Sequence, residues 1–110
     1  MSMVKSIVFL KRRSDMTQEE FHNYWREVHA PIVLKLPGIR RYVQNRAVKI
    51  GDREPPYDGV AEVWFEDFES LRAAVQSSAW QGVLDDETNF MGHTTKAAPV
   101  LTVEEDEIPV

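Results

Sequence analysis

Residues 17–38, TQEEFHNYWREVHAPIVLKLPG, contain the clearest helix signal of the chain and decide its fold. Thr17 and Glu20 form a T-x-x-E capping box, in which each side chain accepts a hydrogen bond from a free backbone amide of the first turn. Apolar residues at helical spacing predict one buried stripe along this helix, formed by Phe21, Tyr24, Trp25, Val28 and Ile32. Pro31 predicts a kink or interruption near Ala30, because proline has no amide hydrogen and crowds the preceding turn.

Strands are predicted on both sides of this helix. Four segments are rich in β-branched and aromatic residues or alternate between apolar and polar ones, and these are 4–11, 39–48, 59–65 and 95–103. A second helix is expected from its cap Asp67 to about Gln76, and a short third helix from Ser78 towards Asn89. The stretch 49–59, dense in Gly, Pro and Asp, separates the two halves as a loop.

Alternation in the two middle strands predicts which residues share a face. In 39–48, one face is expected to carry Ile39, Val43 and Ala47, and the other Arg40, Tyr42, Gln44 and Arg46. In 59–65, one face is expected to carry Ala61, Val63 and Phe65, and the other Val60, Glu62 and Trp64. In the second helix, the expected buried stripe consists of Phe68, Leu71, Ala74 and Val75.

The order of these elements predicts an α+β fold. It is the βαββαβ pattern of ferredoxin-like domains, with helices on one face of an antiparallel four-stranded sheet. We expect one domain over residues 1–110, with an ordered core at about 4–103 and an acidic tail at 104–110. The helices cover only one face, so a second copy of the chain is the expected cover of the other, giving a homodimer through the sheet.

Composition excludes several classes of protein. The 110 residues are 43% hydrophobic and 28% charged, without a cysteine and without an apolar run of the ~18 residues that a membrane span needs. Disulfides, thiol nucleophiles and thiolate metal sites are therefore excluded, and a cytoplasmic protein is expected. A net charge of −5 argues against a nucleic-acid partner. Residues 1–53 sum to +6 and residues 54–110 to −11, which predicts either solvated faces of opposite sign or neutralisation across a dimer.

Histidines are the first candidates for acid–base chemistry. His22 and His29, seven residues apart, project from one helix edge, with Trp25 between them. They are candidate catalytic residues that address two ends of one bound molecule. The alternative is that both are boundary histidines that hydrogen-bond the backbone, and His93 is interpreted as a loop residue.

A carboxylate and several aromatic residues complete the candidate site. Glu62 lies in mid-strand beside Trp64, where burial would raise its pKa and suit it to acid or base catalysis. The alternative is an ion pair with Arg40 or Arg46. Tyr42 is a candidate for polarising a carbonyl group. The substrate-binding candidates are aromatic residues that suit a flat apolar ligand, namely Tyr24, Trp25, Trp64 and Phe90. No metal-ligand spacing, nucleotide loop or G-x-S-x-G motif is present, so no metal and no cofactor is expected.

Three motifs of the chain resemble the signature of a known family. F-H-N-Y-W-R-E-V-H-A-P from Phe21, P-G-I-R-R-Y from Pro37 and D-G-V-A-E-V-W-F from Asp58 are similar to the EthD family. The resemblance spans about residues 4–103 and implies ferredoxin-like protomers whose sheets form a dimeric α+β barrel. It also implies that an enzyme of this type works without metal or flavin, through His29 of the H-x-P motif. The surrounding residues would be Tyr24, Trp25, Tyr42, Glu62 and Trp64.

The function expected from these residues is that of a cofactor-independent enzyme of isomerase, lyase or oxygenase type. It would carry out acid–base chemistry on a small cyclic or aromatic carbonyl compound. One alternative is a dimeric binding or accessory protein that delivers a metabolite within a degradation pathway. Another is a haem-binding barrel.

Overall fold

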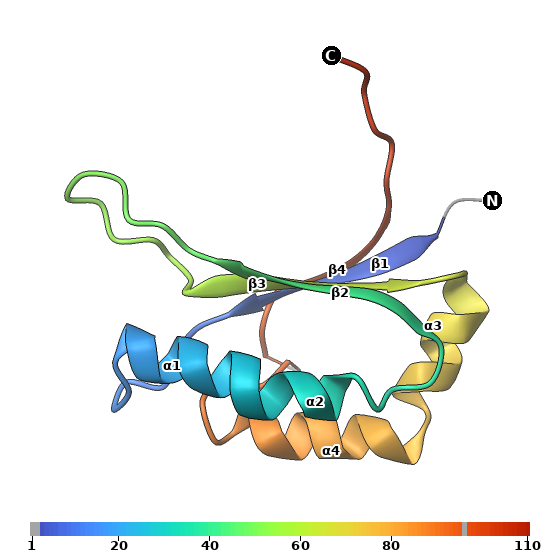
Figure 1. Ribbon diagram of the computed structural model, residues 1–110, viewed down its shortest axis with the longest axis horizontal. Coiled ribbons are helices and arrows are strands. Elements are labelled where there is room, and N and C mark those ends of the chain that lie inside the picture. The colour runs from blue at the N-terminus through green and yellow to red at the C-terminus, as the bar shows by residue number, and fades with distance from the viewer. Residues whose placement is uncertain (1–2, 96) are drawn as a thin grey trace.

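The structure is a computed structural model that describes residues 3–95 and 97–110. Its elements are β1 (Val4–Leu10), α1 (Gln18–Tyr24), the π-helical turn η1 (Trp25–His29), α2 (Ala30–Val33), β2 (Ile39–Arg46), β3 (Gly59–Phe65), α3 (Phe68–Val75), α4 (Ser78–Glu87) and β4 (Val100–Glu104). The strands form one antiparallel sheet in the order β2-β3-β1-β4. All helices lie on one face of this sheet, and the other face is uncovered (Figure 1). The predicted α+β, ferredoxin-like fold is confirmed.

The first helix begins where its capping box predicts. Thr17 Oγ1 accepts from the amide of Glu20 at 3.1 Å, and Glu20 Oε1 accepts from the amide of Thr17 at 2.9 Å. The predicted interruption takes the form of η1, in which the Ala30 amide donates to the carbonyl oxygen of Trp25. The helix then continues through Pro31 to Val33. A π-helical turn of this kind is frequently found at a functional site.

Strand β2 differs from the predicted alternation. Its register shifts between Ile39 and Arg41, so that Ile39 pairs with Phe65 and Tyr42 with Val63. A β-bulge puts one extra residue into a strand and reverses the faces beyond it. Ile39 therefore lies on the helix-covered face together with Tyr42, and its predicted grouping with Val43 is wrong.

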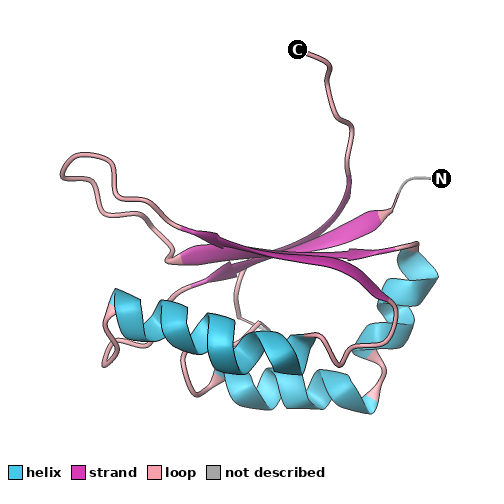
Figure 2. Cartoon of the chain, in the orientation of Figure 1, coloured by secondary structure: helices cyan, strands magenta, loops and turns pink. Residues whose placement is uncertain are grey.

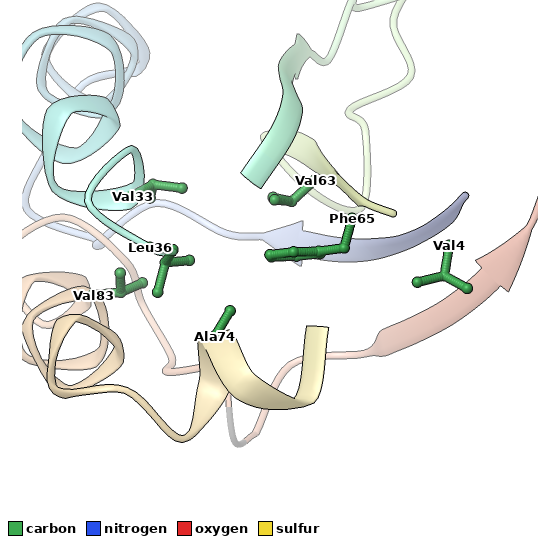
Figure 3. Close-up of a cluster of buried hydrophobic side chains, with 7 residues drawn as sticks. All are labelled: Val4, Val33, Leu36, Val63, Phe65, Ala74 and Val83. Carbon is green, nitrogen blue, oxygen red and sulfur yellow. The ribbon is translucent and has the colours of Figure 1, made fainter. Parts of the chain in front are cut away.

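The core fills the space between the helices and the sheet. Figure 3 shows one cluster, which consists of Val4, Val33, Leu36, Val63, Phe65, Ala74 and Val83. The predicted faces of β3 are confirmed, since Ala61, Val63 and Phe65 are buried on the helix side. In α3 the expected stripe is only partly correct: Ala74 is fully buried, but Phe68 is 55% exposed.

Two extended segments leave the sheet on its uncovered side. They are the β2–β3 hairpin and the tail beyond β4, both drawn as loops in Figure 2. Strand β4 begins at Val100, later than the predicted residue 95, so Thr95 belongs to the preceding loop. Within the described residues, no helix combines the length and apolar character needed to cross a membrane.

Candidate functional site

An inner cavity of about 80 Å³ lies between the helices and the covered face of the sheet. Its walls are mostly apolar side chains. The polar side chains among the lining residues are Ser6, Trp25, His29, Tyr42, Glu87 and Thr95. A mostly apolar enclosure with a few polar groups is the usual form of a small-molecule site.

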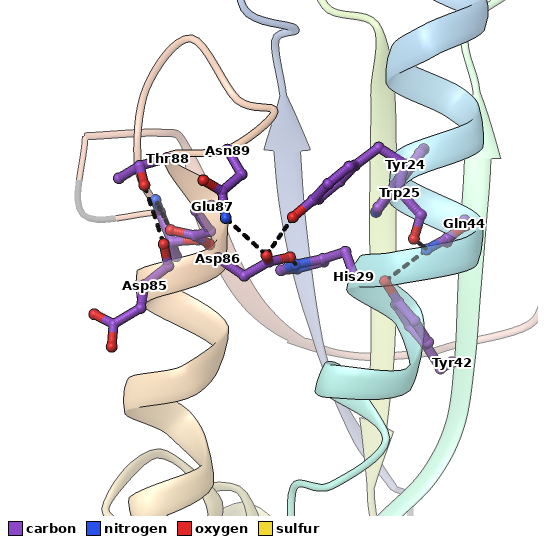
Figure 4. A network of polar contacts seen from close by, with 11 residues as sticks. Tyr24, Trp25, His29, Tyr42, Gln44, Asp85, Asp86, Glu87, Thr88 and Asn89 are labelled. Carbon is purple, nitrogen blue, oxygen red and sulfur yellow. Dashed lines mark hydrogen bonds and ion pairs between the residues drawn. The ribbon is translucent and has the colours of Figure 1, made fainter.

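His29 is held at the wall of this cavity by a buried carboxylate from α4. Its Nδ1 lies 2.8 Å from Oδ2 of Asp86, and both side chains are buried. The Tyr24 hydroxyl donates to Oδ1 of Asp86 at 2.5 Å, and Asn89 Nδ2 donates to the same oxygen at 3.1 Å (Figure 4). Asp86 therefore joins α4 to the first helix through two hydrogen bonds, and the third comes from Asn89 just beyond α4. The Phe90 ring, with its centroid 4.7 Å from that of His29, packs against the imidazole.

These contacts decide which nitrogen of His29 is basic. Burial would raise the pKa of Asp86, but hydrogen bonds from Tyr24, His29 and Asn89 outweigh it and hold that pKa below its usual value. An ionised carboxylate only accepts hydrogen bonds, so Nδ1 of His29 must carry the proton. Burial lowers the pKa of His29 although Asp86 opposes the shift, which keeps the imidazole neutral near pH 7. Nε2 therefore holds the free lone pair, on the edge of the ring away from Asp86, and His29 is one of the residues that line the cavity.

Tyr42 and Trp25 also line this cavity, and each carries a hydrogen-bond donor. Gln44 Nε2 donates to the carbonyl oxygen of Trp25 at 2.9 Å and to the Tyr42 hydroxyl at 2.9 Å. Because the Tyr42 oxygen accepts from Gln44, its own proton is available to another acceptor. Burial raises the pKa of Tyr42, while Gln44 and the nearby Trp25 indole oppose that shift, so the hydroxyl stays protonated. The indole Nε1 of Trp25 is buried near this hydroxyl, and among the described residues no hydrogen bond of good geometry is formed to it.

Trp25 is fixed in place by close contact with strand β3. A Cβ atom added at Gly59 would lie 2.6 Å from Cζ3 of Trp25 and 2.9 Å from the carbonyl oxygen of Asn45. Only glycine leaves room there for the six-membered ring of the indole. The ring is also 5.6 Å, centroid to centroid, from Phe21.

Glu87, one residue beyond Asp86, places a carboxylate at the cavity. Its side chain accepts from the amide of Thr95 at 2.8 Å through Oε1, and from the Thr95 hydroxyl through Oε2. Glu87 also acts on His29, since its negative charge works to raise the histidine pKa. The helix α4 thus brings both Asp86 and Glu87 to this site.

Glu62 and Trp64 do not share the cavity with His29. Both lie on the uncovered face of the sheet, where Glu62 forms an ion pair of 2.8 Å with Lys5. Hydrogen bonds from Lys5 and Asn45 lower the pKa of Glu62, so the expected rise is wrong. The predicted arginine partner is also wrong, because Lys5 is nearer in the sheet register. Trp64 lies between Lys5 and Arg41, whose charged groups are 4.9 and 4.5 Å from its ring centroid.

The remaining candidates do not line the cavity, and two of them lie beside His29 and its partner Asp86. Tyr24 binds Asp86, and Phe90 packs on the imidazole ring. His22 lies at the outer edge of the helix, with Nε2 3.4 Å from the carbonyl oxygen of Asp58. Of the predicted site residues, the structure therefore gathers His29, Tyr42 and Trp25 around the cavity, with Tyr24 and Phe90 behind them.

Sequence reasoning missed Asp86 and Glu87. Their signal is the spacing of α4, because Val83, Asp86, Glu87 and Phe90 follow the helical pattern of a buried face. Two carboxylates on such a face need partners inside the fold. Among the described residues, no group of three or more His, Cys, Asp and Glu side chains is arranged to hold a metal ion.

Comparison with known proteins identifies the family. The model of the EthD domain matches residues 13–94. A search of curated proteins finds no match. A solved structure of an ethyl tert-butyl ether degradation (EthD) family protein from Bacillus halodurans C-125 is 27% identical, with a TM-score of 0.77, covering 94% of this chain and 99% of that chain.

Two further solved structures share the fold at low sequence identity. SnoaB from Streptomyces nogalater, described as a cofactor-independent oxygenase, is 11% identical with a TM-score of 0.65, covering 98% of this chain and 97% of that one. A dimeric protein of unknown function from Bacteroides fragilis NCTC 9343 is 15% identical with a TM-score of 0.67, covering 96% and 98%. Because the EthD domain model matches most of its length, this chain belongs to the EthD family.

Proposed function

We propose that the protein is a cofactor-independent enzyme that binds a small carbonyl compound in the inner cavity and moves a proton beside the carbonyl group. The observation that carries this proposal is the arrangement of His29, whose Nδ1 is bound to Asp86 at 2.8 Å while its ring forms part of the cavity wall. A neutral imidazole with one nitrogen anchored is a general base at the other nitrogen.

The proposed step follows from the donors and acceptors of the cavity. Nε2 of His29 removes a proton from the carbon next to the carbonyl group, and the electrons of the C–H bond form the enolate. The Tyr42 hydroxyl donates to the enolate oxygen. Asp86 stabilises the imidazolium that forms. Return of the proton to the same carbon regenerates the ketone, and its return to another position isomerises the compound.

The size of the cavity limits the substrate. Its volume is about 80 Å³, whereas a cavity of about 150 Å³ binds benzene in a protein interior. The ligand is therefore a short-chain ketone or a small ring in this conformation, and an aromatic ring would require the cavity to widen. A haem group does not fit this space. SnoaB supports the proposal in that a protein of the same fold is described as a cofactor-independent oxygenase.

Proton exchange tests this function without knowledge of the natural substrate. Butanone in deuterated buffer at pH 7 is expected to gain deuterium at the carbons beside its carbonyl group faster with the protein than without it. Nuclear magnetic resonance or mass spectrometry measures the rate. Binding of butanone without exchange would instead favour the accessory, metabolite-delivering protein.

We propose also that the protein is a homodimer that assembles through the uncovered face of the sheet. Partly exposed apolar side chains lie on this face, namely Ile7, Phe9, Val43, Val60, Leu101 and Val103. Apolar patches of this kind mark protein–protein contacts. The solved structure of the Bacteroides fragilis protein of the same fold is described as dimeric.

Two leucines of equal exposure provide a matched test of this dimer. Leu101 is 57% exposed on the uncovered face, and Leu34 is 56% exposed on the helix layer. Leu101→Glu is expected to turn a dimer into a monomer in sedimentation velocity, because a charge in an apolar interface is costly to desolvate. Leu34→Glu is expected to stay dimeric. A dimer that survives Leu101→Glu, or one that is lost equally in both variants, contradicts this interface.

A further inference from the structure

Glu87 is a buried carboxylate that the proposed proton transfer does not use. Its side chain lines the inner cavity, and the residue is only 3% exposed. Within residues 3–95 and 97–110, its hydrogen-bond donors are the amide and hydroxyl of Thr95, and no Lys or Arg forms an ion pair with it. A buried carboxylate without a cation is costly to maintain, so its presence at a cavity points to a ligand that binds it.

Glu87 has acceptor capacity left for such a ligand. A carboxylate offers about four lone-pair positions, and the two hydrogen bonds from Thr95 occupy two of them. Both carboxylate oxygens already accept a hydrogen bond, and their remaining lone pairs can also only accept one. Only a hydrogen-bond donor of the ligand can fill them.

The charge around this end of the cavity is negative. Asp86 is the adjacent residue of α4, also buried, and its partners are the donors of Tyr24, His29 and Asn89. Because burial keeps His29 uncharged near pH 7, it does not cancel the two carboxylates. A third negative charge, brought by a ligand, would be repelled by both in a medium of low dielectric constant.

Tyr42 places a hydrogen-bond donor beside the same cavity. Its oxygen accepts from Gln44, and Tyr42 is one of the lining residues, so its proton is available to a ligand. The buried indole N–H of Trp25 lies near that hydroxyl and lowers its pKa, so it serves Tyr42 rather than a ligand. A donor at Tyr42 and an acceptor at Glu87 together fit a ligand with one acceptor group and one donor group.

We propose that Glu87 is a specificity-determining residue and that the substrate is an uncharged hydroxy-carbonyl compound. The hydroxyl of the substrate donates to the Glu87 carboxylate, and its carbonyl oxygen accepts from Tyr42. Keto acids are excluded by the two carboxylates of Glu87 and Asp86. This inference rests on the proposed function of the cavity and adds to it the class of substrate.

Three carbonyl compounds of similar size test the selection. Hydroxyacetone carries the hydroxyl group, butanone replaces it with a methyl group, and pyruvate carries a carboxylate. We expect hydroxyacetone to bind at least about tenfold more tightly than butanone, because hydrogen bonds to a charged group are among the stronger ones. Pyruvate is expected not to bind. Chemical-shift titration of the full chain at pH 7 measures the three dissociation constants.

Glu87→Gln separates the role of the charge from that of the cavity. This variant keeps the shape of the side chain, and we expect it to bind hydroxyacetone about as weakly as butanone and to gain measurable binding of pyruvate. Asp85→Asn, an exposed residue of the same helix, is the control and should keep the wild-type order. Circular dichroism shows whether each variant is folded. If Glu87→Gln does not fold, the order of the three dissociation constants of the wild-type protein decides whether the proposal holds.

The outcomes distinguish the two proposals. Equal binding of hydroxyacetone and butanone, or binding of pyruvate by the wild-type protein, overturns the role of Glu87 and leaves the cavity as a ketone site. Failure of all three compounds to bind overturns both proposals. An unchanged order in Glu87→Gln contradicts the assignment of specificity to this residue.

Discussion

Replacing Asp86 with alanine is expected to lower the free energy of unfolding at pH 7 by about 2–6 kcal/mol, because two buried donors lose their acceptor at roughly 1–3 kcal/mol each. Asp86 accepts hydrogen bonds from Tyr24, His29 and Asn89, two of which come from the first helix. Without the carboxylate, the hydroxyl of Tyr24 and the N–H of His29 lose their acceptor inside the fold. Urea unfolding at a fixed protein concentration measures the change.

Asp85 gives the matched control for this prediction. It is the preceding residue of α4 and is exposed, with a hydrogen bond from Gln81 at 2.7 Å. Asp85→Ala should change the free energy of unfolding by no more than about 0.5 kcal/mol. Equal effects of the two alanine substitutions would mean that Asp86 is not the group that joins α4 to the first helix.

Replacing His29 with alanine is expected to reduce the protein-catalysed exchange of deuterium into butanone by about 10²–10⁴-fold, the typical contribution of a general base. The loss follows from the removal of Nε2, the free basic nitrogen at the cavity. Because an alanine also leaves a space beside Phe90, the conservative variant His29→Gln is measured as well. Glutamine fills the site and lacks a basic nitrogen, so it should lose the exchange activity to the same extent.

His22 is the control for the exchange experiment. It lies on the same edge of the first helix but contacts the carbonyl oxygen of Asp58, outside the cavity. His22→Ala should retain the wild-type exchange rate. If His22→Ala lost activity and His29→Ala kept it, the base would have to be sought at the outer edge of the helix.

Local signals in the sequence were sufficient to predict most of the fold. The capping box at Thr17 and the cap at Asp67 are short-range hydrogen bonds, and both are found in the structure. The alternation of strand 59–65 is also local, and its two faces are as predicted. Such features depend on residues that are close in the sequence, so they form wherever the helix or strand itself forms.

The features that were not predicted depend on contacts between distant segments. The bulge in β2 is a shift of its register against β3, and it brings Tyr42 to the side of His29. The π-helical turn begins at Trp25, and the carbonyl oxygen of that residue accepts a hydrogen bond from Gln44, which belongs to strand β2. Neither arrangement has a signature within the segment itself.

The candidate site shows the same division. His29 follows from its place on the first helix, but its partner Asp86 lies 57 residues away in the chain. Glu62 was placed correctly on its strand face, and that face is the uncovered one, where Lys5 neutralises it. The pKa of Glu62 is decided by the charged residue on the neighbouring strand. The alternation of residues within its own strand does not reveal that partner.

The tautomer of His29 tests the central claim of this account most directly. Nitrogen-15 spectroscopy of the imidazole ring, recorded while the pH is lowered from 8 to 5, reports which nitrogen carries the proton and when the second nitrogen gains one. We predict a proton on Nδ1 and a bare Nε2 at pH 7, with protonation of Nε2 only below the ordinary histidine pKa of about 6.5. A proton on Nε2 at pH 7, in either the neutral or the charged ring, would contradict His29 as the base of the cavity.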